Sequence, residues 1–207
     1  MATAAKEILK LTEPRVRGPS PSYDRAQFLL SFLLIGNKAT IGRAALARSS
    51  GLGGGAVRTV LRKLTDGGYV TIDPSGCHLT PSGNALHASL RRRLSDLLTL
   101  EDTPLTMGRF QVALVVRGGG PRVTGGIEQR DSAVRAGATG ATTYTITRGK
   151  FAVPGGSTDC QKDFPSGAWA RLRSELKPSE GDAVILCGSS DELKATLGAL
   201  SAALTLF

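Results

Sequence analysis

A helix between two sets of glycines, within residues 51–68, constrains the fold of this chain more than any other feature. Four apolar residues follow the i, i+3, i+4, i+7 spacing that buries one face of a helix. They are Val57, Val60, Leu61 and Leu64. Gly51 precedes this stripe, and Gly67 and Gly68 follow it. Because glycine commonly ends helices, we expect a helix over about residues 54–66.

This helix opens with residues that are poor helix formers. Gly53, Gly54 and Gly55 stand at its start, and a glycine inside a helix costs about 1 kcal/mol relative to alanine. One explanation is that another molecule must come close to the backbone here, where side chains would obstruct it. The other is that the turn needs backbone angles that glycine adopts readily. The sequence leaves both explanations open.

Further helices and a hairpin are expected around this segment. Helical periodicity predicts helices over 23–35 and 40–49 and a long helix from residue 81, and alternation predicts strands over 69–73 and 77–80. Ser22, Thr40 and Thr80 are the expected N-caps. The N-terminal half of the chain therefore has the order helix, helix, helix, hairpin, helix.

Both this order and four residues in it resemble the winged helix-turn-helix domain. The helix-turn-helix pattern has a small residue, a glycine four positions later, and apolar residues ten and thirteen positions after the small one. Ala47, Gly51, Val57 and Val60 occupy these places. The small residue and the glycine allow two helices to cross closely. The resemblance covers residues 23–80 and implies that the N-terminal end of the second helix enters the major groove of DNA.

The candidate DNA-binding residues lie on this pair of helices. Arginine pairs with guanine edges or phosphates, and the first helix of the pair crosses the DNA backbone. The candidates are Arg43, Arg48, Gly54, Gly55, Arg58, Thr59, Arg62 and Lys63. The alternative is an ordinary solvated helix face. The hairpin tip, residues 73–76, has no cation, so Arg15 and Arg17 of the N-terminal arm are weaker candidates for a groove contact.

The charge of the chain favours a polyanionic partner. The formal net charge is +9, and the first 104 residues carry +6 of it, from 14 Lys and Arg against 8 Asp and Glu. The chain has no apolar run long enough to span a bilayer and no secretory signal, so we expect no membrane partner. Three widely separated cysteines, Cys77, Cys160 and Cys187, argue against a disulfide framework and for a cytoplasmic protein.

Strands and helices alternate in the C-terminal half. We expect strands over 109–116, 141–147, 150–153 and 182–187, and helices over 127–137, 165–176 and from about residue 190 to residue 204. This α+β chain would thus pair the winged helix with an α/β sandwich. The βαββαβ order suggests a ferredoxin-like arrangement with one added C-terminal helix.

A second resemblance spans nearly the whole chain. The runs GGIEQRDSAVRAGATGATTYTI, EGDAVILCGSS and LGALSAALTL resemble an archaeal family of transcriptional regulators. Its members pair an N-terminal winged helix with a C-terminal domain of unknown function. The resemblance implies an archaeal, cytoplasmic regulator and names no effector.

The C-terminal half also offers a candidate ligand site. The loop 117–126 has five glycines and leads into a helix N-terminus, where backbone N–H groups and the helix dipole favour an anion. The candidate ligand-binding residues are Arg117, Gly119, Gly120, Arg122, Gly126, Glu128, Arg130 and Asp131. Glu128 and Asp131 also suit acid–base chemistry or a salt-bridged surface. The loop does not match a P-loop.

We expect no catalytic residue, no metal site and no cofactor. The two histidines, His78 and His87, both lie in the N-terminal half, and Cys77–His78 offers too few ligands for a structural metal. The expected function is sequence-specific binding of double-stranded DNA by a transcriptional regulator, with a C-terminal domain that binds a small anionic effector or dimerises. One alternative is a bifunctional protein whose C-terminal domain is an enzyme, such as a small-molecule kinase. Another is a winged helix that binds proteins only.

The expected organisation has four parts. Residues 1–21 form a flexible arm, 22–98 the DNA-binding domain, 99–108 a linker and 109–207 the effector or dimerisation domain. A leucine row lines the helix expected from residue 81. It consists of Leu86, Leu90, Leu94 and Leu97. Because regulators of pseudo-palindromic sites are dimers, we expect a homodimer that uses this row, the C-terminal domain, or both.

Overall fold

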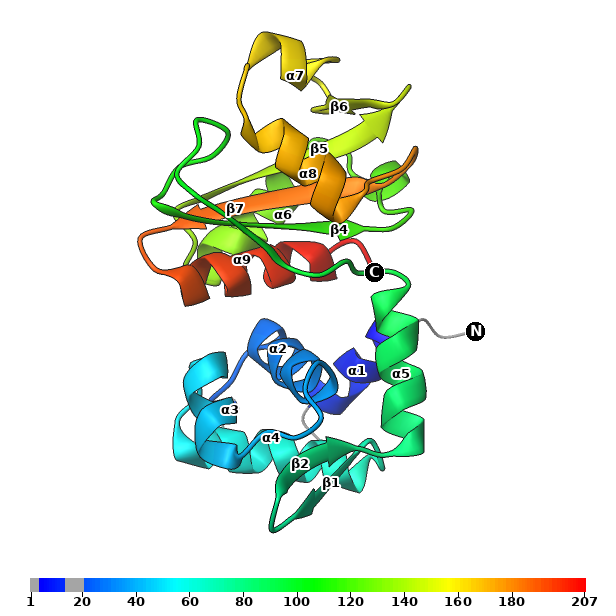
Figure 1. The fold of residues 1–207 in the computed structure, drawn as a ribbon, viewed down its shortest axis with the longest axis vertical. Helices are drawn as coiled ribbons and strands as arrows, with labels where there is room; N and C mark the ends of the chain where they lie inside the picture. The colour runs from blue at the N-terminus through cyan, green and yellow to red at the C-terminus, as the bar shows by residue number, and fades with distance from the viewer. Residues whose placement is uncertain (1–3, 14–20) are drawn as a thin grey trace. The chain divides into compact units, whose positions relative to one another are not determined.

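The computed structural model describes residues 4–13 and 21–207, and it divides the chain into two compact units. The first unit is Met1–Leu90 and the second is Arg91–Phe207. Both mix helices and strands, in agreement with the α+β class (Figure 1). None of the helices in the described ranges combines the length and apolar character needed to cross a membrane.

The first unit is mainly helical. Its elements are α1 (Ala4–Thr12), α2 (Arg25–Gly36), α3 (Arg43–Ser50), α4 (Gly54–Asp66), β1 (Val70–Asp73), β2 (Gly76–Leu79) and α5 (Pro81–Arg91). Strands β1 and β2 form an antiparallel hairpin. The core includes large side chains of α2, of which Phe28, Phe32 and Ile35 have no exposed surface.

The helix caps differ in part from the sequence prediction. Asp24, not Ser22, caps α2, because its carboxylate accepts the amide of Gln27 while the Gln27 side chain returns to the Asp24 amide. The N-cap of α3 is Gly42, and the Thr40 hydroxyl instead donates to the Ser75 carbonyl. The Thr80 cap is confirmed, since its Oγ1 accepts the Gly83 amide at 3.0 Å.

The N-terminal arm is partly helical and packed. Helix α1 contacts α2 and α4, and its Ile8 side chain is fully buried. The Tyr69 hydroxyl donates to the Glu7 carboxylate, which is the main reason that the pKa of Tyr69 rises to about 12. A flexible arm over 1–21 is therefore wrong for residues 4–12. The apolar residues Ile8 and Leu11 are the sequence feature that could have predicted this packed helix.

The hairpin is held to the loop before α3 through His78. Its Nδ1 lies 3.1 Å from the Ala39 carbonyl oxygen, and its Nε2 lies 3.1 Å from Asp73 Oδ1. Hydrogen bonding to Asp73 and then to Ala39 raises the pKa of His78 above its ordinary value of 6.5. Hydrogen bonds from Ser75 and His78 lower the pKa of Asp73 to about 2.

We expect these two groups to make the stability of the first unit depend on pH. A raised His78 pKa stabilises the fold below pH 6.5, and this contribution is lost as the pH rises through the raised value. The lowered pKa of Asp73 stabilises the fold above pH 3.8, and this stabilisation is lost as the pH falls toward 2. Thermal unfolding followed by calorimetry should show the melting temperature falling above pH 6.5. A His78→Gln variant should lose that fall, and an equal fall in the variant would contradict the assignment.

The leucine row does not form one helix face. Helix α5 ends at Arg91, and Leu94 forms an isolated bridge with Val116 of the second unit. Leu86, Leu90 and Leu94 are all at most 6% exposed within the single chain. Three of the four leucines are therefore buried within the single chain and are not available to a dimer interface.

The second unit is a five-stranded sheet between two layers of helices. Its strands are β3 (Leu98–Leu100), β4 (Phe110–Val116), β5 (Gly140–Thr147), β6 (Lys150–Ala152) and β7 (Ala183–Ser189), in the order β3-β4-β7-β5-β6. The helices are the short 3₁₀ turn η1 (Gly120–Arg122), α6 (Ile127–Arg135), α7 (Cys160–Asp163), α8 (Ala168–Leu176) and α9 (Glu192–Leu204). All neighbouring strands are antiparallel.

Helices cover both faces of this sheet (Figure 1). Helices α6 and α9 pack together on one face, and α9 contacts β4 and β7. On the other face, Trp169 and Leu172 of α8 belong to a buried cluster with Tyr144 and Phe151. The rings of Trp169 and Phe151 lie 4.9 Å apart, which adds to the packing. Cys77, Cys160 and Cys187 are buried and unbonded.

The ferredoxin-like prediction is wrong in topology. The strand between β4 and β5 is β7, the last strand, whereas a ferredoxin-like sheet places the third strand of its βαββαβ unit there. Strand β6 lies instead at the edge, and β3 adds a strand at the opposite edge. Helices on both faces also differ from the two layers of a ferredoxin-like sandwich. The added C-terminal helix is present as α9.

The segment expected as a linker belongs to the second unit. Leu98 and Leu100 of β3 are buried and pair with β4, and Leu105 is only 7% exposed. The Gln111 amide also donates to the carbonyls of Thr103 and Thr106. Residues 99–108 are therefore anchored to the sheet, and the division between the units falls at Leu90–Arg91.

Candidate nucleic-acid interface

The turn between α3 and α4 holds the two helices in a fixed crossing. Gly51 ends α3 in the left-handed conformation, with φ of 67°, which glycine adopts without strain. The amide of Leu52 donates to the Ala47 carbonyl at 3.0 Å, and Gln27 of α2 donates to the Gly51 carbonyl. Val57 and Val60 of α4 are at most 2% exposed. Gly51, Val57 and Val60 therefore have the backbone conformation and the burial that the sequence pattern predicts.

The glycines at the start of α4 have no conformational or packing reason to be glycine. Gly53 has φ of −67° and Gly54 and Gly55 are helical, so none of the three uses the left-handed region. A Cβ atom added at each would meet no described atom within 4 Å. The turn explanation therefore does not hold for these three positions, and an open surface lies in front of them.

Both helices of the pair have N-termini without side-chain caps in the described structure. The N-caps are Gly42 for α3 and Gly53 for α4, and neither helix has an acidic residue in its first turn. The partial positive charge of each N-terminus thus remains uncompensated. Arg43 adds a cation to the first turn of α3, where the dipole disfavours it. Such an arrangement suits an external anion.

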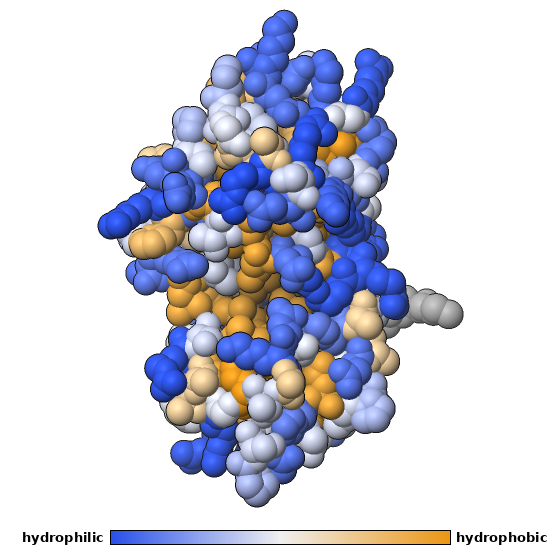
Figure 2. Space-filling view, viewed as in Figure 1, coloured by the Kyte–Doolittle hydropathy of each residue, from blue (hydrophilic) through white to orange (hydrophobic). Residues whose placement is uncertain are grey.

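Four arginines of the predicted set are exposed on these helices. They are Arg43, Arg48, Arg58 and Arg62. Hydrophilic side chains gather at the edge of the first unit around α3 and α4 (Figure 2). The sequence from Ile41 to Thr65 contains no acidic residue. This part of the surface is therefore cationic over both helices.

Two residues of the predicted set are engaged elsewhere. Lys63 Nζ donates to the carbonyl oxygens of Leu11 and Glu13 at 2.8 and 2.9 Å, so it caps the C-terminal end of α1, where a cation is stabilising. The Thr59 hydroxyl donates to the Gly55 carbonyl of its own helix. Lys63 therefore stabilises the docking of α1 instead of facing outward from α4.

The hairpin tip is acidic, as the sequence indicates. The Asp73 carboxylate accepts the amides of Ser75 and Gly76, and its pKa of about 2 keeps it ionised. A charge of this sign does not favour contact with phosphates. Arg15 and Arg17 lie outside the described residues.

The predicted anion-binding loop, 117–126, is closed by the protein itself. Asp182, 4% exposed, accepts the Arg117 guanidinium at 2.9 Å and the Gly118 amide at 2.8 Å. Arg117 also donates to the Leu176 and Lys177 carbonyls at the end of α8. Its charge is therefore satisfied internally.

Two further amides of this loop are also paired within the protein. The Gly119 amide donates to the Val116 carbonyl and the Gly120 amide to the Gly181 carbonyl. A Cβ at Gly120 would lie 2.7 Å from that oxygen, so close packing explains this glycine. Arg122 and Glu128 are exposed, and Gly126 is the N-cap of α6. The amides of Gly118, Gly119 and Gly120 are therefore paired within the protein and are not directed at an external anion.

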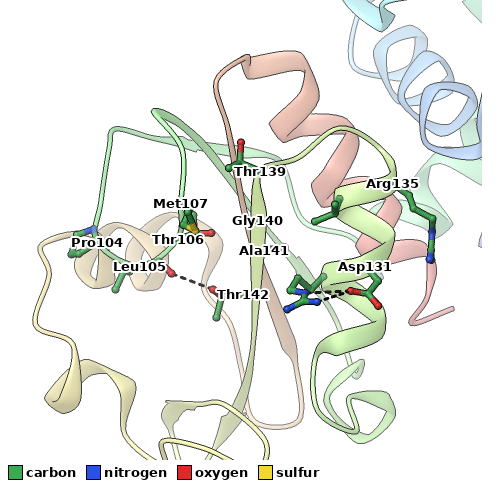
Figure 3. A pocket seen from close by; sticks show the side chains of 12 residues that line it. Pro104, Leu105, Thr106, Met107, Asp131, Arg135, Thr139, Gly140, Ala141 and Thr142 are labelled. Carbon is green, nitrogen blue, oxygen red and sulfur yellow. Dashed lines mark hydrogen bonds and ion pairs between the residues drawn. The ribbon is translucent and has the colours of Figure 1, made fainter.

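Arg130 and Asp131 instead line a pocket of about 710 Å³ further along α6. Its other walls are the loop 104–107 and the beginning of β5 (Figure 3). Arg130 Nη2 lies 3.1 Å from Asp131 Oδ1. The sequence analysis did not predict that residues 104–107 line a pocket, because it assigned residues 99–108 to a linker.

Comparison with known proteins identifies part of the second unit. Residues 107–206 match a domain of unknown function (DUF4443). The DUF4443 region therefore contains most of the sheet and the helices on both of its faces. No curated protein matches the chain.

One solved structure resembles most of the chain. Its title is "Hypothetical protein PH0730 from Pyrococcus horikoshii OT3". It is 25% identical, with a TM-score of 0.69, and the similarity covers 87% of this chain and 91% of that one. The DUF4443 description and this title name no activity and no ligand.

Proposed function

We propose that the chain is a sequence-specific DNA-binding transcriptional regulator, whose first unit is a winged helix-turn-helix domain. Helix α4 is the recognition helix in this proposal, α3 crosses the phosphate backbone, and β1 and β2 form the wing. The resemblance of the sequence to archaeal regulators supports the proposal. The similarity to a structure from Pyrococcus horikoshii agrees with an archaeal relative.

The start of α4 carries the proposal. Three consecutive glycines there have ordinary helical or extended backbone angles and open space in front of them. They expose backbone N–H groups next to Arg58, and the N-terminus of α3 with Arg43 repeats the pattern. A phosphate or base edge that approaches the backbone would explain why residues costly to a helix are placed here.

The proposal is tested by selection from a random duplex DNA library on the full-length protein. We expect a consensus sequence to be enriched, and its affinity to fall linearly with the logarithm of salt concentration, as release of counterions requires. A double-stranded competitor of scrambled sequence measures specificity. Absence of enrichment together with salt-independent binding would contradict the proposal and favour a winged helix that binds proteins.

The glycines supply a prediction that separates stability from binding. Gly54→Ala and Gly55→Ala should each increase the free energy of unfolding by about 0.5–1 kcal/mol, because alanine is the better helix former and its methyl group meets open space. The same variants should bind the selected duplex more weakly, since the methyl groups occupy the approach. Denaturation and fluorescence anisotropy measure the two effects. A stabilised variant with unchanged DNA affinity would show that DNA does not approach here.

A further inference from the structure

Strand β5 of the second unit has an edge that no strand covers within the described chain. It pairs with β7 through Gly140–Thr145, but with β6 only through Thr145–Thr147. The first half of β5 therefore pairs with a strand on one side only; Thr143 is buried and η1 contacts the strand, so the open part of this edge lies at Ala141. Such an edge presents unpaired backbone groups to which another extended segment can bind.

The register identifies the backbone groups at this free edge. Ile146 donates its amide to the Asp182 carbonyl at 3.0 Å, so even-numbered residues of β5 direct their N–H and C=O groups toward β7. In an antiparallel sheet the intervening residues face the opposite side. Ala141 therefore directs its N–H and C=O groups to the free edge, where it lines the pocket of about 710 Å³.

Two walls hold this edge in a groove (Figure 3). One is the loop 104–107, whose Leu105 carbonyl accepts the hydroxyls of Thr142 at 3.2 Å and Tyr144 at 3.3 Å. The other is α6. Each wall presents an apolar side chain, Met107 at 69% and Val134 at 47% exposure. Alternating side chains of a bound strand would meet these two walls in turn.

We propose that this groove binds an extended peptide segment that adds as a strand to β5. The occupant is chosen by charge, because the α6 wall of the groove carries two arginines and one carboxylate, Arg130, Arg135 and Asp131. Arg130 is paired with Asp131, whereas Arg135 is exposed beside it. The groove therefore favours a peptide with an acidic side chain toward α6.

The test uses a library of random hexapeptides displayed on phage, selected on the full-length protein. We expect enriched peptides to alternate apolar and polar residues and to carry Asp or Glu. Ala141→Pro removes the outward N–H group without removing a hydrogen bond to β7, since the Ala141 amide does not pair with β7. It should weaken binding about tenfold, while Ala141→Ser, which keeps the amide, should bind as the wild type does. Arg135→Glu should select peptides with Lys or Arg.

Hydrogen exchange of the wild-type protein provides a readout that needs no variant. The Ala141 amide should exchange faster than that of Thr142 in the free protein, and an enriched peptide should slow it. This measurement decides the matter if Ala141→Pro fails to fold. An Ala141 amide already protected without peptide, or enriched peptides that leave its exchange unchanged, would overturn the proposal, as would a library that yields no binder. None of these outcomes bears on DNA binding by the first unit.

Discussion

Replacing Asp182 with alanine is expected to destabilise the second unit by about 3 kcal/mol. The Asp182 carboxylate accepts the Arg117 guanidinium and the amides of Gly118 and Ser179 at 2.8–2.9 Å. It thereby joins the end of β4, the turn before β7 and, through Arg117, the end of α8. Its removal leaves two amides without their acceptor and the Arg117 guanidinium without its counterion, although Arg117 keeps its bonds to the Leu176 and Lys177 carbonyls.

The reciprocal variant, Arg117→Ala, provides the matched comparison. The Arg117 side chain is 32% exposed and the Asp182 side chain 6%, so Arg117 is the better solvated partner. Without it, Asp182 still accepts two amides. We therefore expect Arg117→Ala to cost less than Asp182→Ala. Urea unfolding followed by fluorescence of Trp169, the single tryptophan, reports on the second unit. The opposite order of the two costs would contradict this account of the network.

Local patterns were sufficient to predict most of the helices and strands. The glycines around α4 and its apolar stripe predicted Gly54–Asp66, the range that the structure gives. The strands predicted over 141–147 and 150–153 leave only Arg148 and Gly149 between them, and both residues have positive φ in the hairpin of β5 and β6. These features depend on neighbours in the sequence, where periodicity and turn chemistry act directly.

Features that depend on distant residues were not predictable in the same way. The position of β7 between β4 and β5 depends on pairing of segments that are about 40 to 80 residues apart. Strand β3 has only three residues, and it becomes a strand because β4 is beside it. Helix α1 is short, and its packing against Tyr69 and Lys63 stabilises it more than its own propensity does.

The same distinction applies to the candidate sites. Periodicity correctly placed Val57 and Val60 in the core and Arg58 and Arg62 at the surface. It could not show that Lys63 caps α1, since that contact joins residues 50 or more positions apart. Likewise, the composition of the loop 117–126 indicated an anion site, but Asp182 supplies the negative charge from within the chain. A local excess of Arg and Gly therefore predicts a negatively charged hydrogen-bond acceptor, but not whether that acceptor is a ligand or a side chain of the same protein.

Loss of both exposed arginines of α4 should have the largest effect on DNA binding. Alanine at Arg58 and Arg62 is expected to cost about 1–3 kcal/mol of binding free energy for each residue. Their side chains are exposed on the helix proposed to enter the major groove. Little change in stability is expected, because exposed substitutions away from special features are usually small in effect. Anisotropy titrations with the selected duplex, at several salt concentrations, measure the loss.

The salt dependence shows what each arginine contacts. An arginine on a phosphate lowers the salt slope by about 1 when it is removed, and affinity then falls for all sequences alike. An arginine on a guanine edge leaves the slope nearly unchanged and relaxes the preference at one base pair. Arg109→Ala with Arg122→Ala removes the same charge from exposed positions of the second unit. If this control weakens binding as much as the α4 variant does, the attraction is to net charge, and α4 is not the recognition helix.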